Sequence, residues 1–164
     1  MKQNSALTWL VPLVAVLGLL VAGMGLFSQG GDGSFTFRTI HGTTVEMYGE
    51  GLYRNDSLFV GALFRGTDVI TMFVGLPLLL AGYWLYLRTS LKGTLFLIGT
   101  LLYFLYIGVT YTFSAIFNPL FLVYTALFST SLYATIIALT TFPAQLLMDK
   151  AASDLPRRGI LSGF

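Results

Sequence analysis

The chain lacks cysteine and has a single histidine, His41, among its 164 residues. Without cysteine there is no disulfide, no thiol nucleophile and no thiolate ligand for zinc or an iron–sulfur cluster. A single histidine also excludes a paired-histidine metal motif and a haem held by two histidines. We therefore expect no catalytic residues, no metal site and no cofactor.

Charge is also scarce in this sequence. Lys, Arg, Asp and Glu make up 10% of the residues and the net charge is +2, whereas soluble domains carry about 25% charged residues. No basic stripe is present, so we expect no nucleic-acid partner. Hydrophobic residues make up 55% of the chain. The expected surroundings of the protein are therefore a lipid bilayer.

Long apolar runs without any charged residue or histidine account for most of this hydrophobicity. They cover residues 6–27, 69–87, 94–115 and 119–142. About 20 residues of helix cross the hydrocarbon core, and only a helix satisfies its own backbone in lipid. The sequence predicts an all-α transmembrane fold, a four-helix up-down bundle, in which Pro77 bends the second helix. Because Lys2 precedes the first run and small residues lie near its end, a cleaved signal peptide is the alternative to an uncleaved anchor.

The basic residues predict how these helices are oriented. The two ends of the chain and the turn between the second and third runs carry Lys2, Arg88, Lys92, Lys150, Arg157 and Arg158. The long loop, residues 28–68, has more acidic than basic residues. We therefore expect a multi-pass protein of the plasma or bacterial inner membrane, with both termini in the cytoplasm and the loop outside.

Residues 143–164 are predicted to form a cytoplasmic amphipathic tail with a short helix at 145–153. The last residues turn apolar after a basic stretch. This pattern indicates that the chain is truncated before a further span or that its end rests in the membrane interface.

The long loop contains two β-prone runs, residues 35–40 and 43–48, separated by His41-Gly42. Two such runs joined by a short turn with glycine predict a small extracytoplasmic β-hairpin between the first and second helices. An isolated hairpin is only marginally stable in water. We therefore expect it to rest on the helix ends or to pair with another strand.

Residues 58–64 carry no charge and are too short to span a membrane. They predict a separate interfacial or re-entrant piece, which Asp56 or Ser57 can cap. Thr67-Asp68 would then cap the second spanning helix. Arg65 lies three residues before Asp68 and is placed to form an ion pair with it.

Two groups of residues are candidates for a functional site. Most ionisable side chains of the loop region could form a recognition site: Glu46, Glu50, Tyr53, Arg54, Asp56, Arg65 and Asp68. The alternative is that they form a solvated surface and helix caps. Hydroxyl groups at helical spacing in the third and fourth runs could line an intramembrane seam: Tyr103, Tyr106, Thr110, Tyr124, Ser131 and Thr135. In lipid such hydroxyls usually serve helix packing, and Tyr111 fits an aromatic belt at the interface.

Small residues recur at spacings of three and four on the first two helices. They are Ala15, Gly18, Ala22 and Gly25 on the first, and Thr71, Gly75 and Gly82 on the second. Small residues let helix backbones approach closely in lipid. They predict helix–helix contacts within the bundle or a face for self-association.

Three segments carry a resemblance to known proteins: Gly51-Leu-Tyr-Arg-Asn-Asp-Ser57, Arg65-Gly-Thr-Asp68 and Asn118-Pro-Leu-Phe-Leu-Val-Tyr124. Together they resemble a set of uncharacterised bacterial multi-spanning membrane proteins, over residues 46–139. The resemblance implies further helices after the Pro-Arg-Arg stretch and no activity. In layout the chain is also similar to claudin-like tetraspan proteins. The cysteine pair and the tryptophan motif of that family's first loop are missing, so a barrier function does not follow.

The sequence favours a non-enzymatic integral membrane protein with an accessory or assembly role. Its partners would be the lipid bilayer and either a second copy or another membrane protein, bound through the 28–68 loop. A small transporter, channel or lipophile-binding protein that uses the seam is the alternative. A third hypothesis is an enzyme acting on a lipid or periplasmic substrate, which would need Glu46, Glu50, Asp56 and Asp68 to cluster in a pocket.

Overall fold

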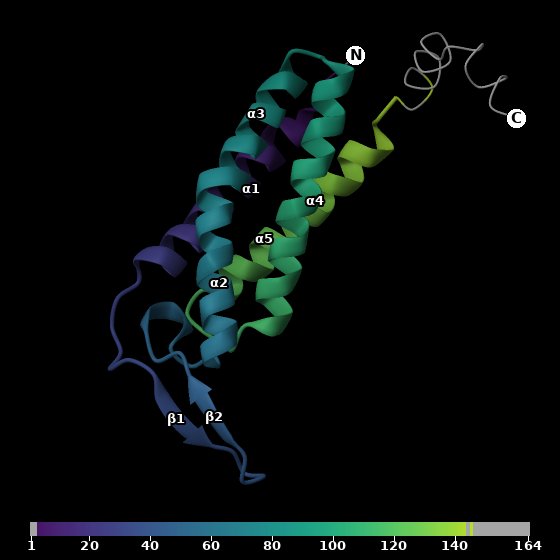
Figure 1. Ribbon diagram of the computed structural model, residues 1–164. Helices are drawn as coiled ribbons and strands as arrows, with labels where there is room; N and C mark the ends of the chain where they lie inside the picture. Colours follow the sequence, from purple (N-terminus) through teal and green to yellow (C-terminus); the bar gives the residue numbers. More distant parts are fainter. Residues whose placement is uncertain (1–2, 144, 146–164) are drawn as a thin grey trace, which may run out of the picture.

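The computed structural model describes residues 3–143 and 145. In this part of the chain four helical segments are long and apolar enough to cross a membrane: Ser5–Phe27, Leu58–Leu87, Leu91–Ser114 and Phe121–Thr140. They lie side by side, and a two-stranded sheet extends from one end of the bundle (Figure 1). The prediction of four apolar helices with a small sheet, typical of a multi-pass membrane protein, is confirmed. The predicted tail helix at 145–153 lies outside the described residues, apart from residue 145.

The second helical segment is longer than predicted. Helix α2 (Leu58–Ile70), a π-helical turn η2 (Thr71–Gly75) and α3 (Leu76–Leu87) follow one another without a break, and together they have 30 residues. The prediction of a separate re-entrant piece at 58–64, and of a cap at Thr67-Asp68, is wrong. Ser57 caps α2, its Oγ accepting from the backbone N–H of Val60 at 3.4 Å, and no proline lies between Ser57 and Pro77.

The π-helical turn lies immediately before Pro77. Proline has no N–H and its ring crowds the carbonyl one turn earlier, which disrupts a regular α-helix. In η2 the backbone N–H of Leu76 donates to the carbonyl of Thr71, so the helix is wider by one residue at this point. A π-helical turn thus precedes Pro77 in the middle of the segment, and the bend that the sequence predicts there stays a prediction.

Polar side chains at the helix starts define the other three helices. Asn4 caps α1 (Ser5–Phe27), its side chain accepting from Ala6 N–H at 2.9 Å. Ser90 caps α4 (Leu91–Ser114), after Thr89 has reversed the chain with a φ of 56°. Before α5 (Phe121–Thr140), the side-chain oxygen of Asn118 accepts from Leu120 N–H at 2.9 Å.

Close helix contacts at glycines hold the bundle together, as the small-residue pattern predicts. A Cβ at Gly18 of α1 would overlap the ring of Phe104 in α4, 2.5 Å away. A Cβ at Gly82 of α3 would lie 3.2 Å from the backbone of Leu97 in α4. A Cβ at Gly108 of α4 would lie 2.7 Å from Phe128 Cα in α5. These glycines allow the backbones to approach, and the core between them is filled by Leu, Val and aromatic side chains.

The predicted hairpin is also confirmed. Strands β1 (Phe35–Arg38) and β2 (Thr44–Met47) are antiparallel, with Phe35 opposite Met47 and Phe37 opposite Val45. The turn is closed by Thr39 N–H donating to Thr43 O at 2.8 Å, and Gly42 within it has a φ of 81°, which favours glycine. The hairpin points away from the helices (Figure 1).

Candidate functional site

Asp68 of α2 is a fully buried carboxyl at the end of the bundle that carries the hairpin. Its Oδ2 accepts from the hydroxyl of Tyr53, and its Oδ1 accepts from the hydroxyl of Tyr111, both at 2.7 Å. Tyr53 belongs to a short 3-10 helix, η1 (Gly51–Tyr53), and Tyr111 belongs to α4. A carboxyl inside a membrane protein is costly unless such bonds satisfy it. Asp68 therefore ties three separate elements together.

Aromatic rings enclose this carboxyl. We call Tyr53, Phe64, Asp68, Tyr111 and Tyr124 the Asp68 cluster. The ring centroids of Phe64 and Tyr111 are 4.8 Å apart, and those of Tyr111 and Tyr124 are 5.1 Å apart. Each of these rings is almost completely buried. The cluster thus joins α2, α4 and α5 through stacked and tilted rings. Such ring pairs stabilise the folded protein by more than the burial of their apolar area alone.

Helix α1 reaches the Asp68 cluster through Gly25. A Cβ at this position would overlap Asp68 Oδ2 and would lie 2.6 Å from the Tyr53 hydroxyl. Only glycine leaves room for the carboxyl against the α1 backbone. Gly25, which the sequence places in a general stripe of small residues, therefore has a specific role: it completes the enclosure of Asp68 on the side of α1.

The hydrogen atoms in the cluster can be counted. The Tyr111 hydroxyl carries one hydrogen, and it lies 2.7 Å from Asp68 Oδ1 and 3.1 Å from the carbonyl oxygen of Phe64. One hydrogen cannot serve two acceptors fully. If Asp68 carries a proton on Oδ1, it donates to Tyr111, which then donates to Phe64, and every group is satisfied. The geometry thus accommodates a neutral carboxyl without any rearrangement.

Arg65 does not pair with Asp68, so that prediction is wrong. Its Nη1 donates to the hydroxyl of Tyr48 at 3.0 Å and lies 3.7 Å from Glu50 Oε2. Asp68 faces the interior of the bundle, whereas Arg65 faces the segment that follows β2. Because Tyr48 directly follows β2, the Arg65 guanidinium connects the helix to the base of the hairpin.

Asp56 is a second buried acid near this end of the bundle. Its Oδ1 accepts from the backbone N–H of Ile116, between α4 and α5, at 3.1 Å, and its carbonyl accepts from Tyr48 N–H at 2.9 Å. Burial raises the pKa of Asp56, and the bond from Ile116 opposes this rise. Burial is also the main cause that raises the pKa of Tyr53, so its hydroxyl remains a hydrogen-bond donor.

The predicted recognition residues therefore divide into two groups. Tyr53, Asp56 and Asp68 are buried and bonded within the fold. Glu46, Glu50 and Arg54 are exposed, and Arg65 is half-buried at the base of the hairpin. The structure does not gather all seven side chains into one surface. No single binding or acid–base site follows from them.

The hairpin presents an apolar surface instead. Phe35, Phe37, Val45 and Met47 lie on the same side of the two strands, because paired residues of an antiparallel ladder share a face. We call these four residues the hairpin face. Phe35 is 48% exposed and Phe37 is 53% exposed. The opposite side is polar, with Thr36 opposite Glu46 and Arg38 opposite Thr44.

The base of the hairpin is fixed to the bundle by several contacts. Met47 forms an antiparallel bridge with Ser57, the residue that caps α2. Gly49 N–H donates to Arg54 O at 3.1 Å, and Leu52 N–H donates to Ser28 Oγ at 2.8 Å. The hairpin is thus mounted on the same segment that supplies Tyr53 and Asp56. Its orientation is set by the buried end of the bundle.

The residues predicted to form an intramembrane seam lie on several different surfaces. The Tyr103 hydroxyl is 2.8 Å from Thr71 Oγ1 and faces the second helical segment, whereas Tyr106 is 64% exposed. Tyr124 belongs to the Asp68 cluster. Thr110 is half-buried. Ser131 and Thr135 are buried, and each donates to a carbonyl of its own helix at 2.7 Å.

Sequence reasoning missed Tyr111 as a partner of Asp68. It was assigned to an aromatic belt because it lies near the end of an apolar run. A signal was present, since a carboxyl at the start of a spanning segment needs donors, and Tyr111 is a hydroxyl at the matching end of the third run. The pairing itself depends on the helix packing, which periodicity does not give.

Within the described part of the chain, no group of three or more His, Asp or Glu residues is arranged to hold a metal ion. Comparisons of the chain with models of protein families, with curated proteins and with solved structures gave no match. The resemblance to bacterial multi-spanning proteins therefore stays a prediction. Any function must be argued from the geometry of the molecule.

Proposed function

We propose that this chain is a non-enzymatic, multi-pass membrane protein that binds a partner protein through the hairpin face, in an accessory or assembly role. In this proposal the four helices cross the membrane in alternating directions. Both termini lie in the cytoplasm and the hairpin lies outside, as the distribution of basic residues predicts. The observation that carries the proposal is an apolar strand surface that is exposed but firmly mounted.

The exposure of the hairpin face supports binding. Two aromatic side chains about half exposed on one side of a two-stranded sheet leave apolar area in contact with water. Such patches on a folded protein commonly mark interaction surfaces. In the described structure the outer edge of β1 is unpaired, whereas β2 is bridged on its outer edge at Met47 to Ser57. A partner can therefore supply either a strand or an apolar surface.

The mounting of the hairpin supports the same function. A free hairpin is marginal in water and would have to be ordered when it binds. Here the bridge to Ser57 and the bond from Arg65 to Tyr48 already fix the base of the hairpin. Preorganisation of this kind reduces the entropic cost of association. The fixed base of the hairpin favours a function in which the hairpin face binds a partner over one in which the hairpin only covers the end of the bundle.

Site-specific photo-crosslinking in native membranes tests this proposal. A photoreactive residue at position 37 would lie on the hairpin face, and the same residue at position 36 would lie on the polar side one position away. We expect a defined protein adduct from position 37 and little from position 36. An adduct of twice the chain's mass would identify a second copy as the partner. Equal labelling from both positions, or from neither, would contradict the proposal.

The alternative function, transport or lipophile binding through the seam, has less support. Gly108 brings α4 and α5 to close contact at Phe128, and the hydroxyls of Ser131 and Thr135 are bonded within α5. Tyr106 points away from the core. The enzymatic hypothesis has no better support, since Asp56 and Asp68 are buried while Glu46 and Glu50 are exposed.

A further inference from the structure

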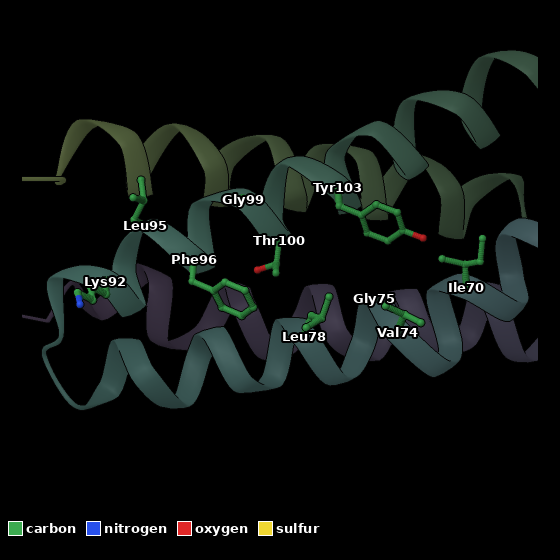
Figure 2. Close-up of a pocket in the computed structure, with 10 residues that line it drawn as sticks. All are labelled: Ile70, Val74, Gly75, Leu78, Lys92, Leu95, Phe96, Gly99, Thr100 and Tyr103. Atoms are coloured by element: carbon green, nitrogen blue, oxygen red, sulfur yellow. The ribbon is translucent and has the colours of Figure 1, made fainter.

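A groove of about 600 Å³ lies between α4 and the α2–η2–α3 segment (Figure 2). It reaches the turn between α3 and α4, at the end of the bundle away from the hairpin (Figure 1). Lys92 lies at one end of this groove, near the turn between α3 and α4, and Ile70 and Tyr103 lie at the other end (Figure 2). Leu78 and Phe96 line its middle. Gly99 forms part of its wall, and a Cβ there would meet nothing within 4 Å.

The wall of the groove is apolar along its length. The Thr100 hydroxyl donates to the carbonyl of Leu97 in its own helix at 2.9 Å. The hydroxyl of Tyr103 forms a hydrogen bond with Thr71 Oγ1 at 2.8 Å. The polar atoms along the groove are therefore already bonded. Only Lys92, at the end, carries a charge among the lining residues.

The Lys92 end of the groove has the features of a membrane–water interface. Arg88, which ends α3, places its guanidinium carbon 3.7 Å from the ring centroid of Trp84. Tryptophan and basic residues concentrate at this level of a bilayer. From Lys92 to Tyr103, α4 rises by about 16 Å at ~1.5 Å per residue. This length matches one leaflet, which is about half of the ~30 Å hydrocarbon core.

We propose that the groove binds one acyl chain of an anionic phospholipid, with the phosphate of its headgroup on Lys92. The acyl chain follows α4 from the interface towards the middle of the membrane. A lipid with net negative charge is favoured, because each basic residue near the surface attracts anionic lipid with about 1 kcal/mol. This proposal is independent of partner binding by the hairpin.

The dimensions of the groove favour an acyl chain over a helix of a second copy. When all the space between the atoms is counted, the groove holds about 1040 Å³, which over a length of about 16 Å gives a mean cross-section of roughly 65 Å². A helix with its side chains is about 10–12 Å across, which corresponds to roughly 80–110 Å². A flexible hydrocarbon chain enters such a groove, whereas a helix would only cover it.

The test fills the groove without disturbing the bundle. Gly99→Leu places a side chain in open space inside the groove. Gly66→Leu is the matched control, because a Cβ at Gly66 of α2 also meets nothing within 4 Å and Gly66 does not line the groove. The wild type and both variants are inserted in nanodiscs of equal phosphatidylglycerol and phosphatidylcholine. Native mass spectrometry then counts the lipids that stay bound and identifies their headgroups.

We expect the wild type and G66L to retain a phosphatidylglycerol molecule that G99L loses, with G99A intermediate. We expect Lys92→Gln to lower the preference for phosphatidylglycerol over phosphatidylcholine about fivefold, which is the loss of one basic residue's attraction. Equal lipid retention by G99L and G66L would overturn the proposal. So would an unchanged headgroup preference in K92Q, or a dimer that is present in the wild type and absent in G99L.

Discussion

Two neighbouring parts of the chain differ in which kind of side chain they bury. Residues 51–68 bury two acids, Asp56 and Asp68, almost completely. Residues 35–47 expose phenylalanines, with Phe37 about half in solvent. Composition alone would have placed the acids outside and the phenylalanines inside. The difference shows that nearby hydrogen-bond donors, and not residue polarity alone, decide whether an acid is buried here.

The donors explain the buried half of this comparison. Asp68 accepts from two tyrosine hydroxyls, and Asp56 accepts from the backbone N–H of Ile116, in the segment between α4 and α5. A buried acid with such donors is stable, whereas a phenylalanine gains burial only where a second apolar surface exists. The hairpin has two strands and one apolar side, and in the proposed function a partner protein supplies that second surface.

Within the two regions compared, the largest effect is expected at Asp68. Asp68→Ala removes an acceptor shared by two buried tyrosine hydroxyls, so the free energy of unfolding should fall by about 2–4 kcal/mol. Asp68→Asn keeps the shape and one acceptor, and its amide N–H can donate to Tyr111, so it should cost about 1 kcal/mol or less. Denaturant unfolding of both variants in the same detergent measures the difference. If D68N loses as much stability as D68A, a negative charge and not the hydrogen-bond count holds the cluster together.

A somewhat smaller effect is expected at the α1 contact. Gly25→Ala adds a methyl group that overlaps Asp68 Oδ2, and such overpacking costs about 1–3 kcal/mol. Gly23→Ala is the matched control on the same helix, because its Cβ would lie 3.7 Å from Met72 Cε, an ordinary contact. Thermal unfolding should show a loss for G25A and no loss for G23A. Equal stability of the two variants would mean that α1 does not press on the cluster.

Much of this fold could be predicted from the sequence. The four apolar helices follow from runs without charge, and the hairpin follows from two β-prone runs around His41-Gly42. The continuity of α2 with α3 could not be predicted. The sequence predicts that Asp68 marks the edge of a span, since a carboxyl inside lipid is costly. The longer helix is possible because two tyrosine hydroxyls donate to this carboxyl.

The candidate site was less predictable than the fold. The sequence identified Tyr53, Asp56 and Asp68, but it grouped them with exposed Glu46 and Arg54. Which side of an element faces the bundle depends on packing between segments far apart in the chain, such as Tyr111 against Asp68. The hairpin face was implicit in the alternation of Phe35 and Phe37 on one strand. The exposure of this face could not be predicted, because it depends on whether another segment of the chain packs over it, and none does among the described residues.

A pH-dependent effect of intermediate size is expected at Asp56. Burial raises the pKa of its carboxyl in the folded protein, so the folded state favours the protonated form. The contribution of the Asp56 carboxyl to stability is therefore fully present below the ordinary aspartate pKa of about 4. This contribution is lost as the pH rises through the pKa of Asp56 in the folded protein. Asp56→Asn has no such titration and keeps the acceptor for Ile116 N–H. The stability of D56N relative to the wild type should rise from pH 4 to pH 7 in denaturant unfolding, and a constant difference would contradict this.

The smallest effect on stability is expected at the hairpin face. Substitutions there test most directly whether its phenylalanines, unlike the buried acids, are free of contacts with the bundle. Phe37→Ala removes a half-exposed ring, and we expect the free energy of unfolding of the bundle to change by about 0.5 kcal/mol or less. Phe104→Ala, the same substitution at a fully buried ring, should cost about 3–5 kcal/mol in the same assay. The photo-crosslinked partner adduct should be lost when Phe35 is replaced by Ala. A loss of more than about 1 kcal/mol in F37A would mean that the ring packs on the bundle, and exposure of the hairpin face would then no longer argue for a partner.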